Sequence, residues 1–214
     1  MENPIEDAKG RRAAARTTVI RGAELYSGYL DAGEQAVLVA DIRAVVTAAP
    51  LFSPLTPWGK QMSVRMTSAG RYGWYSDRKG YRYVDRHPDG QAWPAVPASA
   101  LAIWRALVSE VREPDCCLVN YYTDKAKMGL HQDRDEADLH WPVLSVSLGD
   151  EARFRIGGTE RGGPTDAVWL RSGDVLVLGG AARLAYHGVD RIAPRTSTLL
   201  RGGGRINLTL RVVD

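Results

Sequence analysis

A series of short β-type runs in the second half of the chain limits the fold most strongly. Gly, Asp or Pro residues separate these runs, which are CCLVNYY, PVLSVSL, ARFRI, AVWL, DVLVL, LAYHGV and RINLTLR. Many short strands at close spacing are typical of β-sandwiches and β-barrels, and a jelly roll is a natural candidate. We therefore expect residues 116–214 to form an all-β core.

The first half of the chain predicts helices and strands together. Residues 31–50 are expected to form a helix that begins with a capping box of Asp31 and Glu34 and ends before Pro50. Residues 99–114 predict a second helix, because apolar side chains recur at helical spacing up to Val111. Between the helices, residues 62–90 predict short strands joined by Gly-containing turns.

The expected fold class is therefore α+β and mainly β. We divide the chain into a flexible basic tail (1–17), an α/β extension (18–115) and the β core (116–214), with the extension and the core forming one structural unit. The adjacent Cys116 and Cys117 would point to opposite faces of a strand and are poorly placed to bridge each other. Reduced thiols suggest a cytoplasmic location, and no apolar stretch is long enough to predict a membrane span.

One short segment, HQD, contains a pair of metal-ligand types. His131 and Asp133 are two residues apart, so they share a face if the segment is extended. His187 ends the run LAYH and offers a third ligand, which would complete the two-histidine, one-carboxylate triad of non-haem Fe(II) oxygenases. The alternative is a charged surface loop, since a lone His-x-Asp pair is common by chance. We expect His87 and His140 to lie in surface turns or loops.

The last β-type run places polar side chains on one face. Arg205, Asn207 and Arg211 have the same parity and would project together from a single strand. Two arginines on an inward face are costly to bury without anions, and guanidinium groups bind carboxylates in a bidentate manner. A dicarboxylate ligand would satisfy both, and Asn120 and Tyr122 share a face in another run. The alternative is an edge strand whose charges face water.

The segment between residues 60 and 86 is basic and aromatic. It contains seven Lys or Arg against two Asp, a local excess of five, whereas the net charge of the whole chain is only +3. Five aromatic residues are interleaved with these charges: Tyr72, Trp74, Tyr75, Tyr81 and Tyr83. Basic groups can follow phosphates while aromatic faces stack on bases, so the pattern suggests a nucleic-acid contact. The alternative is a solvated hairpin with an ordinary aromatic core face.

Taken together, these motifs resemble the AlkB family of Fe(II)- and 2-oxoglutarate-dependent dioxygenases. The resemblance rests on NYY, on LHQDRDE, on His187 after GDVLVLGG, and on RINLTLR, whose arginines six residues apart are specific to that family. It covers roughly residues 60–213, and MSVRMTSAGRYGW and RKGYRY resemble a nucleotide-recognition lid. Tyr121, Gly129 and Leu178 look atypical of the bacterial pattern.

The resemblance implies a double-stranded β-helix, a jelly-roll variant, with N-terminal helices and a β-hairpin lid over its open end. It implies that His131, Asp133 and His187 hold Fe(II). The residues implied for 2-oxoglutarate binding are Asn120, Tyr122, Arg205, Asn207 and Arg211. The residues implied for substrate binding are Met66, Trp74, Tyr81, His131, Asp135, Glu136 and Arg161, with Trp74 and His131 on the two faces of a flipped base.

The implied activity is oxidative demethylation of N-alkylated bases of the 1-methyladenine and 3-methylcytosine type in DNA, preferably single-stranded, and in RNA. O2 is the oxidant, and formaldehyde, succinate and CO2 are released. The acidic residues Asp135 and Glu136 suggest a preference for cationic bases. Alternatives are the same chemistry on methylated tRNA, other RNA or a protein, and a non-catalytic jelly-roll binding module. We expect a monomer whose partner is nucleic acid, with no membrane association.

Overall fold

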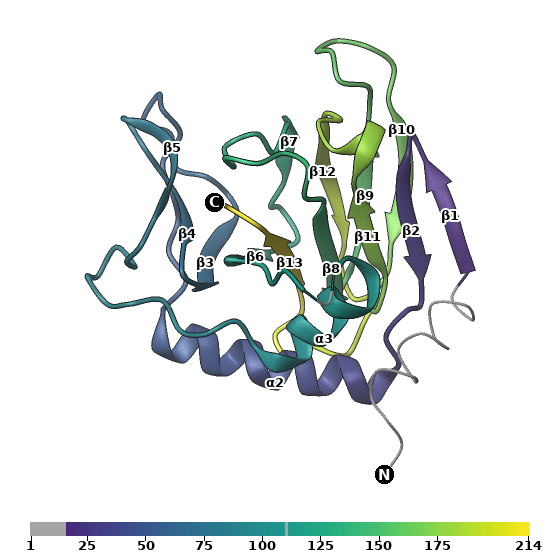
Figure 1. Ribbon diagram of the computed structural model, residues 1–214. Helices are drawn as coiled ribbons and strands as arrows, with labels where there is room; N and C mark the ends of the chain where they lie inside the picture. Colours follow the sequence, from purple (N-terminus) through teal and green to yellow (C-terminus); the bar gives the residue numbers. More distant parts are fainter. Residues whose placement is uncertain (1–15, 110) are drawn as a thin grey trace.

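The computed structural model describes residues 16–109 and 111–214, and two antiparallel β-sheets dominate it (Figure 1). The larger sheet contains, in spatial order, β1 (Arg16–Ile20), β2 (Ala23–Ser27), β11 (Val175–Leu178), β8 (Val143–Gly149), β13 (Arg205–Arg211), β6 (Cys116–Tyr122) and β3 (Arg65–Gly70). The smaller sheet contains β10 (Asp166–Leu170), β9 (Glu151–Ile156), β12 (His187–Ala193) and β7 (Met128–His131). Strands far apart in the sequence are neighbours in both sheets, as the expected jelly roll requires.

The larger sheet joins the two halves of the chain. Its strands β1, β2 and β3 come from the segment before residue 116, and they flank strands from the predicted β core. The proposed basic tail, residues 1–17, lies almost wholly outside the described residues, although its last two residues begin β1. The helices of the described residues are too short or too polar to span a bilayer.

Apolar side chains fill both faces of the larger sheet. One face packs on the smaller sheet, and the other packs on the helices α2 (Ala32–Ala48) and α3 (Ala98–Leu107). The adjacent cysteines show this alternation, because Cys116 lies in the core between the sheets and Cys117 lies in the core beneath the helices. Both are buried free thiols, as predicted.

The beginning of α2 confirms the predicted capping box. The Glu34 amide donates to Asp31 Oδ1 at 2.8 Å, and the Asp31 amide donates to Glu34 Oε2 at 3.0 Å. The helix stops at Ala48, two residues before Pro50, because proline disfavours helical geometry in the residue that precedes it. Its inward side chains Leu38 and Ile42 are almost fully buried against the larger sheet.

The second helix is shorter than the sequence predicted. α3 ends at Leu107, and Val111, which was expected on its apolar face, is 94% exposed. The amides of Val108 and Ser109 both donate to the Trp104 carbonyl, and these two hydrogen bonds close the helix end. The indole of Trp104 then donates to the Arg112 carbonyl at 2.7 Å, so the chain folds back over the helix end instead of extending it.

A separate hairpin, β4 (Gly73–Asp77) and β5 (Gly80–Val84), stands apart from both sheets beside the C-terminus (Figure 1). We call it the lid. His87 follows it and is only 3% exposed, which corrects the prediction of a surface turn. Its ring is packed edge-on against Phe52 and Trp93, and Nε2 lies 2.9 Å from the Pro50 carbonyl. His140, by contrast, lies in an exposed loop as expected.

Candidate active site

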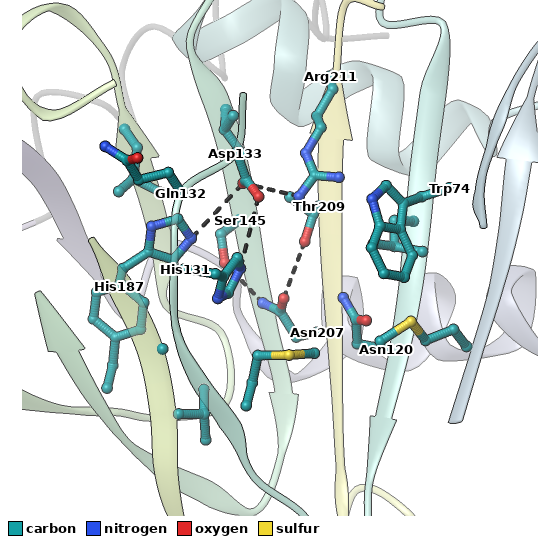
Figure 2. A pocket seen from close by; sticks show the side chains of 18 of the residues that line it. Trp74, Asn120, His131, Gln132, Asp133, Ser145, His187, Asn207, Thr209 and Arg211 are labelled. Carbon is teal, nitrogen blue, oxygen red and sulfur yellow. Dashed lines mark hydrogen bonds and ion pairs between the residues drawn. The ribbon is translucent and has the colours of Figure 1, made fainter. Parts of the chain in front are cut away.

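A cavity lies between the two sheets beneath the lid (Figure 2). Its walls come from β6, β8 and β13 of the larger sheet and from β7, β9 and β12 of the smaller sheet. Trp74 and Tyr81 of the lid complete the rim. One space therefore collects side chains that are up to 149 residues apart in the chain, from Met62 to Arg211.

His131, Asp133 and His187 converge at one end of this cavity, as Figure 2 shows. The potential ligand atoms lie within 4.8 Å of one another. His131 Nε2 lies 3.7 Å from Asp133 Oδ1, and His187 Nε2 lies 3.7 Å from Asp133 Oδ2. Strand pairing places the histidines side by side, because His131 of β7 is the direct partner of His187 of β12.

The hydrogen bonds of the two imidazoles determine which nitrogen faces the centre. In each ring Nδ1 lies 2.9 Å from a backbone carbonyl, Gly129 for His131 and Ala185 for His187. A carbonyl only accepts, so Nδ1 carries the proton and the Nε2 lone pair points toward Asp133. This is the arrangement in which protein imidazoles bind metal ions.

The electrostatic environment favours the metal-binding protonation states. Burial lowers the pKa of His187 to about 4, against the opposing effect of Asp133, so this imidazole is neutral. Burial alone would raise the pKa of Asp133, but Arg211 and the two histidines hold it well below its usual range. The site therefore presents a neutral imidazole at His187 and an ionised carboxylate at Asp133.

Arg211 connects Asp133 to the lid. Its Nη2 lies 2.8 Å from Asp133 Oδ2, and its Nη1 donates to the hydroxyl of Tyr83 at 3.2 Å. The Tyr83 hydroxyl donates to Glu136 Oε1 at 2.5 Å, and Arg183 Nη2 lies 3.0 Å from Glu136 Oε2. Sequence reasoning named Tyr83 only as one of the lid aromatics and missed Arg183, because their partner Glu136 lies 53 and 47 positions away in the sequence.

The structure gives Glu136 a different place from the one suggested by the sequence. Its side chain is almost fully buried, does not line the cavity, and binds Tyr83, Arg183 and Arg211 instead of facing a base. Arg161 also lies outside the cavity lining, and its guanidinium sits 5.6 Å from the ring centre of Tyr186. These two residues therefore need roles other than direct contact with a base in this conformation.

The face of β13 that carries Arg205, Asn207 and Arg211 forms the floor of the cavity. The alternation of side chains along a strand predicted this common face. Arg205 is 1% exposed, and its donors reach only neutral acceptors, namely Ser147 Oγ at 2.6 Å and the carbonyls of Asp150 and Leu170 at 3.2 Å. Its Nε has no hydrogen-bond acceptor within the described part of the chain. The floor thus holds a buried guanidinium whose charge no described carboxylate neutralises by an ion pair.

Polar neighbours of Arg205 add further groups to this floor. Tyr122 is its cross-strand partner, and Asn120 is the partner of Asn207. The side-chain oxygen of Asn120 has no donor among the described residues, whereas Asn207 binds Ser145 and Thr209. Thr209 was not predicted, although the parity that selected Arg205 and Arg211 also applies to it.

The lid contributes two stacked aromatic rings. Trp74 and Tyr81 lie with their ring centres 5.5 Å apart at an interplanar angle of 22°. Trp74 Nε1 donates to Asp135 Oδ2 at 3.3 Å, and both residues line the cavity. Met66 lies within the lining as well. The lid is therefore joined by a hydrogen bond to the segment that follows the metal-ligand pair.

Comparison with known proteins shows which family has this cavity and its two-histidine, one-carboxylate site. The family model of the 2OG-Fe(II) oxygenase superfamily matches residues 22–211. The chain is 54% identical over 206 residues to an alpha-ketoglutarate-dependent dioxygenase AlkB homolog of Caulobacter vibrioides (strain NA1000 / CB15N), covering 95% of this chain and 94% of that protein. The chain belongs to the AlkB family. It is also 42% identical over 165 residues to the alpha-ketoglutarate-dependent dioxygenase AlkB of Escherichia coli (strain K12), covering 75% and 76% of the two chains.

Structural comparison agrees with the sequence comparison. The solved structure of OsALKBH1 superimposes with a TM-score of 0.79 at 32% identity, and the match covers 92% of this chain and all of that chain. This AlkB-family protein is thus an Fe(II)- and 2-oxoglutarate-dependent dioxygenase that uses O2. The jelly-roll prediction and the cofactor prediction are confirmed.

The residues present fit the cofactors of the AlkB family. His131, Asp133 and His187 would hold Fe(II), which supplies oxygen activation when bound and retains open positions for other ligands. Arg205 Nε and Asn120 Oδ1 have no hydrogen-bond partner among the described residues, so the floor has polar groups that could bind a ligand. An anionic ligand would neutralise the buried guanidinium of Arg205.

Proposed function

We propose that this protein is an oxidative demethylase of N-alkylated nucleic-acid bases, acting preferably on single-stranded DNA and also on RNA. One observation carries the proposal: an aromatic lid with an excess of basic residues stands over a cavity that contains a two-histidine, one-carboxylate site. A base within a duplex is not accessible to such a cavity, so the substrate base must be unpaired or flipped. The products are the repaired base, formaldehyde, succinate and CO2.

The floor of the cavity is the proposed 2-oxoglutarate site. Arg205 and Arg211 stand six residues apart on one strand and would each bind one carboxylate of the cosubstrate. Asn120, Tyr122 and Asn207 line the same cavity and would supply neutral polar contacts. A ligand with a carboxylate at each end would pair with both guanidinium groups that line the cavity.

The rim of the cavity is the proposed base site. Trp74 lies across the cavity from His187 in Figure 2, and His131 is the more exposed of the two histidine ligands. A flipped base between Trp74 and His131 would have an aromatic ring on each face, with Tyr81 and Met66 beside it. The base would thus be held next to the metal-ligand atoms of His131.

Asp135 is the proposed selector for a cationic base. Its carboxylate lines the cavity beside Trp74, and alkylation at N1 of adenine or N3 of cytosine fixes a positive charge on the ring. We expect Asp135→Asn, which retains an acceptor for the indole, to lower kcat/KM on 1-methyladenine by about tenfold. Activity on the neutral 1,N6-ethenoadenine should change by less than about twofold.

Steady-state kinetics on the two lesions in the same oligonucleotide measure this difference. The control is Asp138→Asn, which removes an exposed carboxylate three positions further along. Equal losses on both lesions would refute the electrostatic role of Asp135.

Tyr83 is proposed to position Arg211 for the cosubstrate. Its hydroxyl accepts from Arg211 and donates to Glu136, so Tyr83→Phe removes both hydrogen bonds without changing the ring. We expect the Kd for 2-oxoglutarate, measured by calorimetry with Mn(II) in place of Fe(II), to rise about tenfold, as for loss of a hydrogen bond to a charged group. Tyr75→Phe removes a hydroxyl from the other lid strand and should leave the Kd unchanged. An unchanged Kd in Tyr83→Phe would contradict the positioning role.

A second substrate class is suggested by other relatives. One of them, 29% identical over 238 residues, is the "DNA N(6)-methyladenine demethylase ALKBH1C" of Arabidopsis thaliana, and the match covers 96% of this chain and 51% of that protein. N6-Methyladenine is neutral, so it would not use the negative charge of Asp135. The two substrate classes are therefore distinguished by their dependence on this residue.

The experiment is a panel of matched single-stranded oligonucleotides. Each carries one 1-methyladenine, 3-methylcytosine or N6-methyladenine, as DNA and as RNA, and each is incubated with Fe(II), ascorbate and 2-oxoglutarate. We expect loss of one methyl group from the two cationic bases by mass spectrometry. Turnover of 2-oxoglutarate with every oligonucleotide unchanged would assign the protein another substrate, and absence of both iron binding and turnover would indicate a binding module.

A further inference from the structure

A tryptophan at the tip of a tight turn is almost fully exposed. Trp58 is 85% exposed, which is unusual for so large an apolar side chain. The turn is closed by the Gly59 amide donating to the Thr56 carbonyl at 2.8 Å and by the Thr56 amide donating to the Lys60 carbonyl at 2.8 Å. Gly59 has a φ of +78°, a conformation that favours glycine. The backbone therefore holds Trp58 outward on an ordered turn.

This turn is attached to the lid. The Leu55 amide donates to the Ser76 carbonyl at 3.2 Å, and the Ser76 hydroxyl donates to the Leu55 carbonyl at 2.6 Å. At the tip, a Cβ atom added to Gly59 would lie 3.1 Å from Arg78 Nε, so the Arg78 side chain lies directly against the turn. The tip that carries Trp58 and the tip of the β4–β5 hairpin thus form one continuous edge.

Positive charges surround this edge. Lys60, Arg78 and Lys79 are exposed, and none of them forms an ion pair with another described residue. The one nearby carboxylate of the hairpin, Asp77, is already held by Arg82 at 2.8 Å. We call Trp58, Lys60, Arg78 and Lys79 the outer lid edge. It combines an uncovered aromatic face with three cations that lack a described counter-ion.

We propose that the outer lid edge is a second contact for single-stranded nucleic acid, with Trp58 stacking on an unpaired base several nucleotides away from the flipped one. Aromatic stacking with neighbouring cations is the usual way in which proteins bind single strands without sequence preference. The inference rests on the proposed function, because it assumes that the strand enters the cavity under the same lid. The phosphate groups of the bound strand would pair with the cations Lys60, Arg78 and Lys79.

The distance between the outer lid edge and the cavity determines which nucleotide of a bound nucleic-acid strand the edge would contact. Trp74, at the cavity, and Arg78, at the hairpin tip, are four residues apart along β4 and the turn, or about 13 Å at the usual strand rise. Stacked nucleotides are spaced by about 3.4 Å, so this separation corresponds to about four nucleotides. A trinucleotide centred on the cavity would therefore not reach Trp58, whereas a longer strand would.

The test compares two lengths of single-stranded DNA with one 1-methyladenine at the centre. Fluorescence anisotropy gives the Kd for a strand of about fifteen nucleotides, and kinetics give kcat/KM for a trinucleotide. We expect Trp58→Ala to weaken binding of the long strand about tenfold, the typical effect of losing one stacked base, and to change kcat/KM on the trinucleotide by less than about twofold. Trp169→Ala removes another partly exposed tryptophan beside an arginine, on the smaller sheet, and should leave both values unchanged.

Several results would overturn this proposal. Unchanged binding of the long strand in Trp58→Ala would show that the edge does not contact nucleic acid. An equal loss on the long strand and the trinucleotide would place the effect of Trp58 at the cavity. Self-association of the wild-type protein that Trp58→Ala abolishes, with DNA binding unchanged, would assign the edge to contacts between copies. Failure of the demethylase proposal is seen separately, as absent repair of the trinucleotide by the wild-type protein.

Discussion

Replacing Asp133 by alanine is expected to abolish turnover of 2-oxoglutarate, with a fall of more than about 100-fold. Loss of groups that only orient metal ligands already costs about 10–100-fold, and Asp133 is itself one of the three potential ligands. The substitution also removes the carboxylate that lies 2.8 Å from Arg211. Both the metal site and Arg211, which belongs to the proposed cosubstrate site, would lose their fixed geometry.

Two measurements separate a lost metal site from a misfolded protein. Calorimetric titration with Fe(II) under anaerobic conditions should show no binding by Asp133→Ala, while circular dichroism should retain the β-sheet signal of the wild type. Asp138→Ala removes an exposed carboxylate from the same segment and should bind iron normally. Turnover by Asp133→Ala within about tenfold of the wild-type rate would contradict the assignment of this residue.

Replacing Arg205 by methionine is expected to remove 2-oxoglutarate binding. Arg205 is buried against neutral acceptors, and burial lowers its pKa to about 10, because desolvation disfavours the charged guanidinium. Methionine keeps an unbranched side chain at this position without the charge. In the wild type, 2-oxoglutarate at 100 times its Kd should stabilise the Mn(II)-loaded protein by about 2.7 kcal/mol, and this stabilisation should be absent in Arg205→Met.

Thermal unfolding with and without 2-oxoglutarate measures the effect directly. Arg201→Met, an exposed arginine four residues earlier, is the matched control and should respond to 2-oxoglutarate as the wild type does. A full ligand-induced rise of Tm in Arg205→Met would show that the buried guanidinium has another purpose.

Strand periodicity made much of the fold and the cavity predictable. Side chains alternate between the two faces of a strand, so parity alone placed Arg205 and Arg211 together on the cavity side of β13 and Leu208 on the opposite face. The capping box at Asp31 was also predictable, because its hydrogen bonds join residues only three positions apart.

Contacts made by the irregular segments could not be predicted from the alternation of side chains along a strand. β7 ends at His131, so alternation no longer applies to the residues that follow, and Glu136 turns into the core instead of facing the cavity. Its partners Tyr83 and Arg183 come from distant parts of the chain and carry no local signal. The early end of α3 likewise depends on a hydrogen bond from Trp104 to a carbonyl beyond the helix.

We propose that oxidation of 2-oxoglutarate at the site formed by His131, Asp133 and His187 is coupled to removal of a methyl group from a nucleic-acid base. The most direct test counts succinate, formaldehyde and repaired base in one reaction on single-stranded DNA that contains 1-methyladenine. We expect one succinate and one formaldehyde for each base repaired. Succinate formation at the same rate with and without the DNA, and with the methyl group still present on the base, would contradict it.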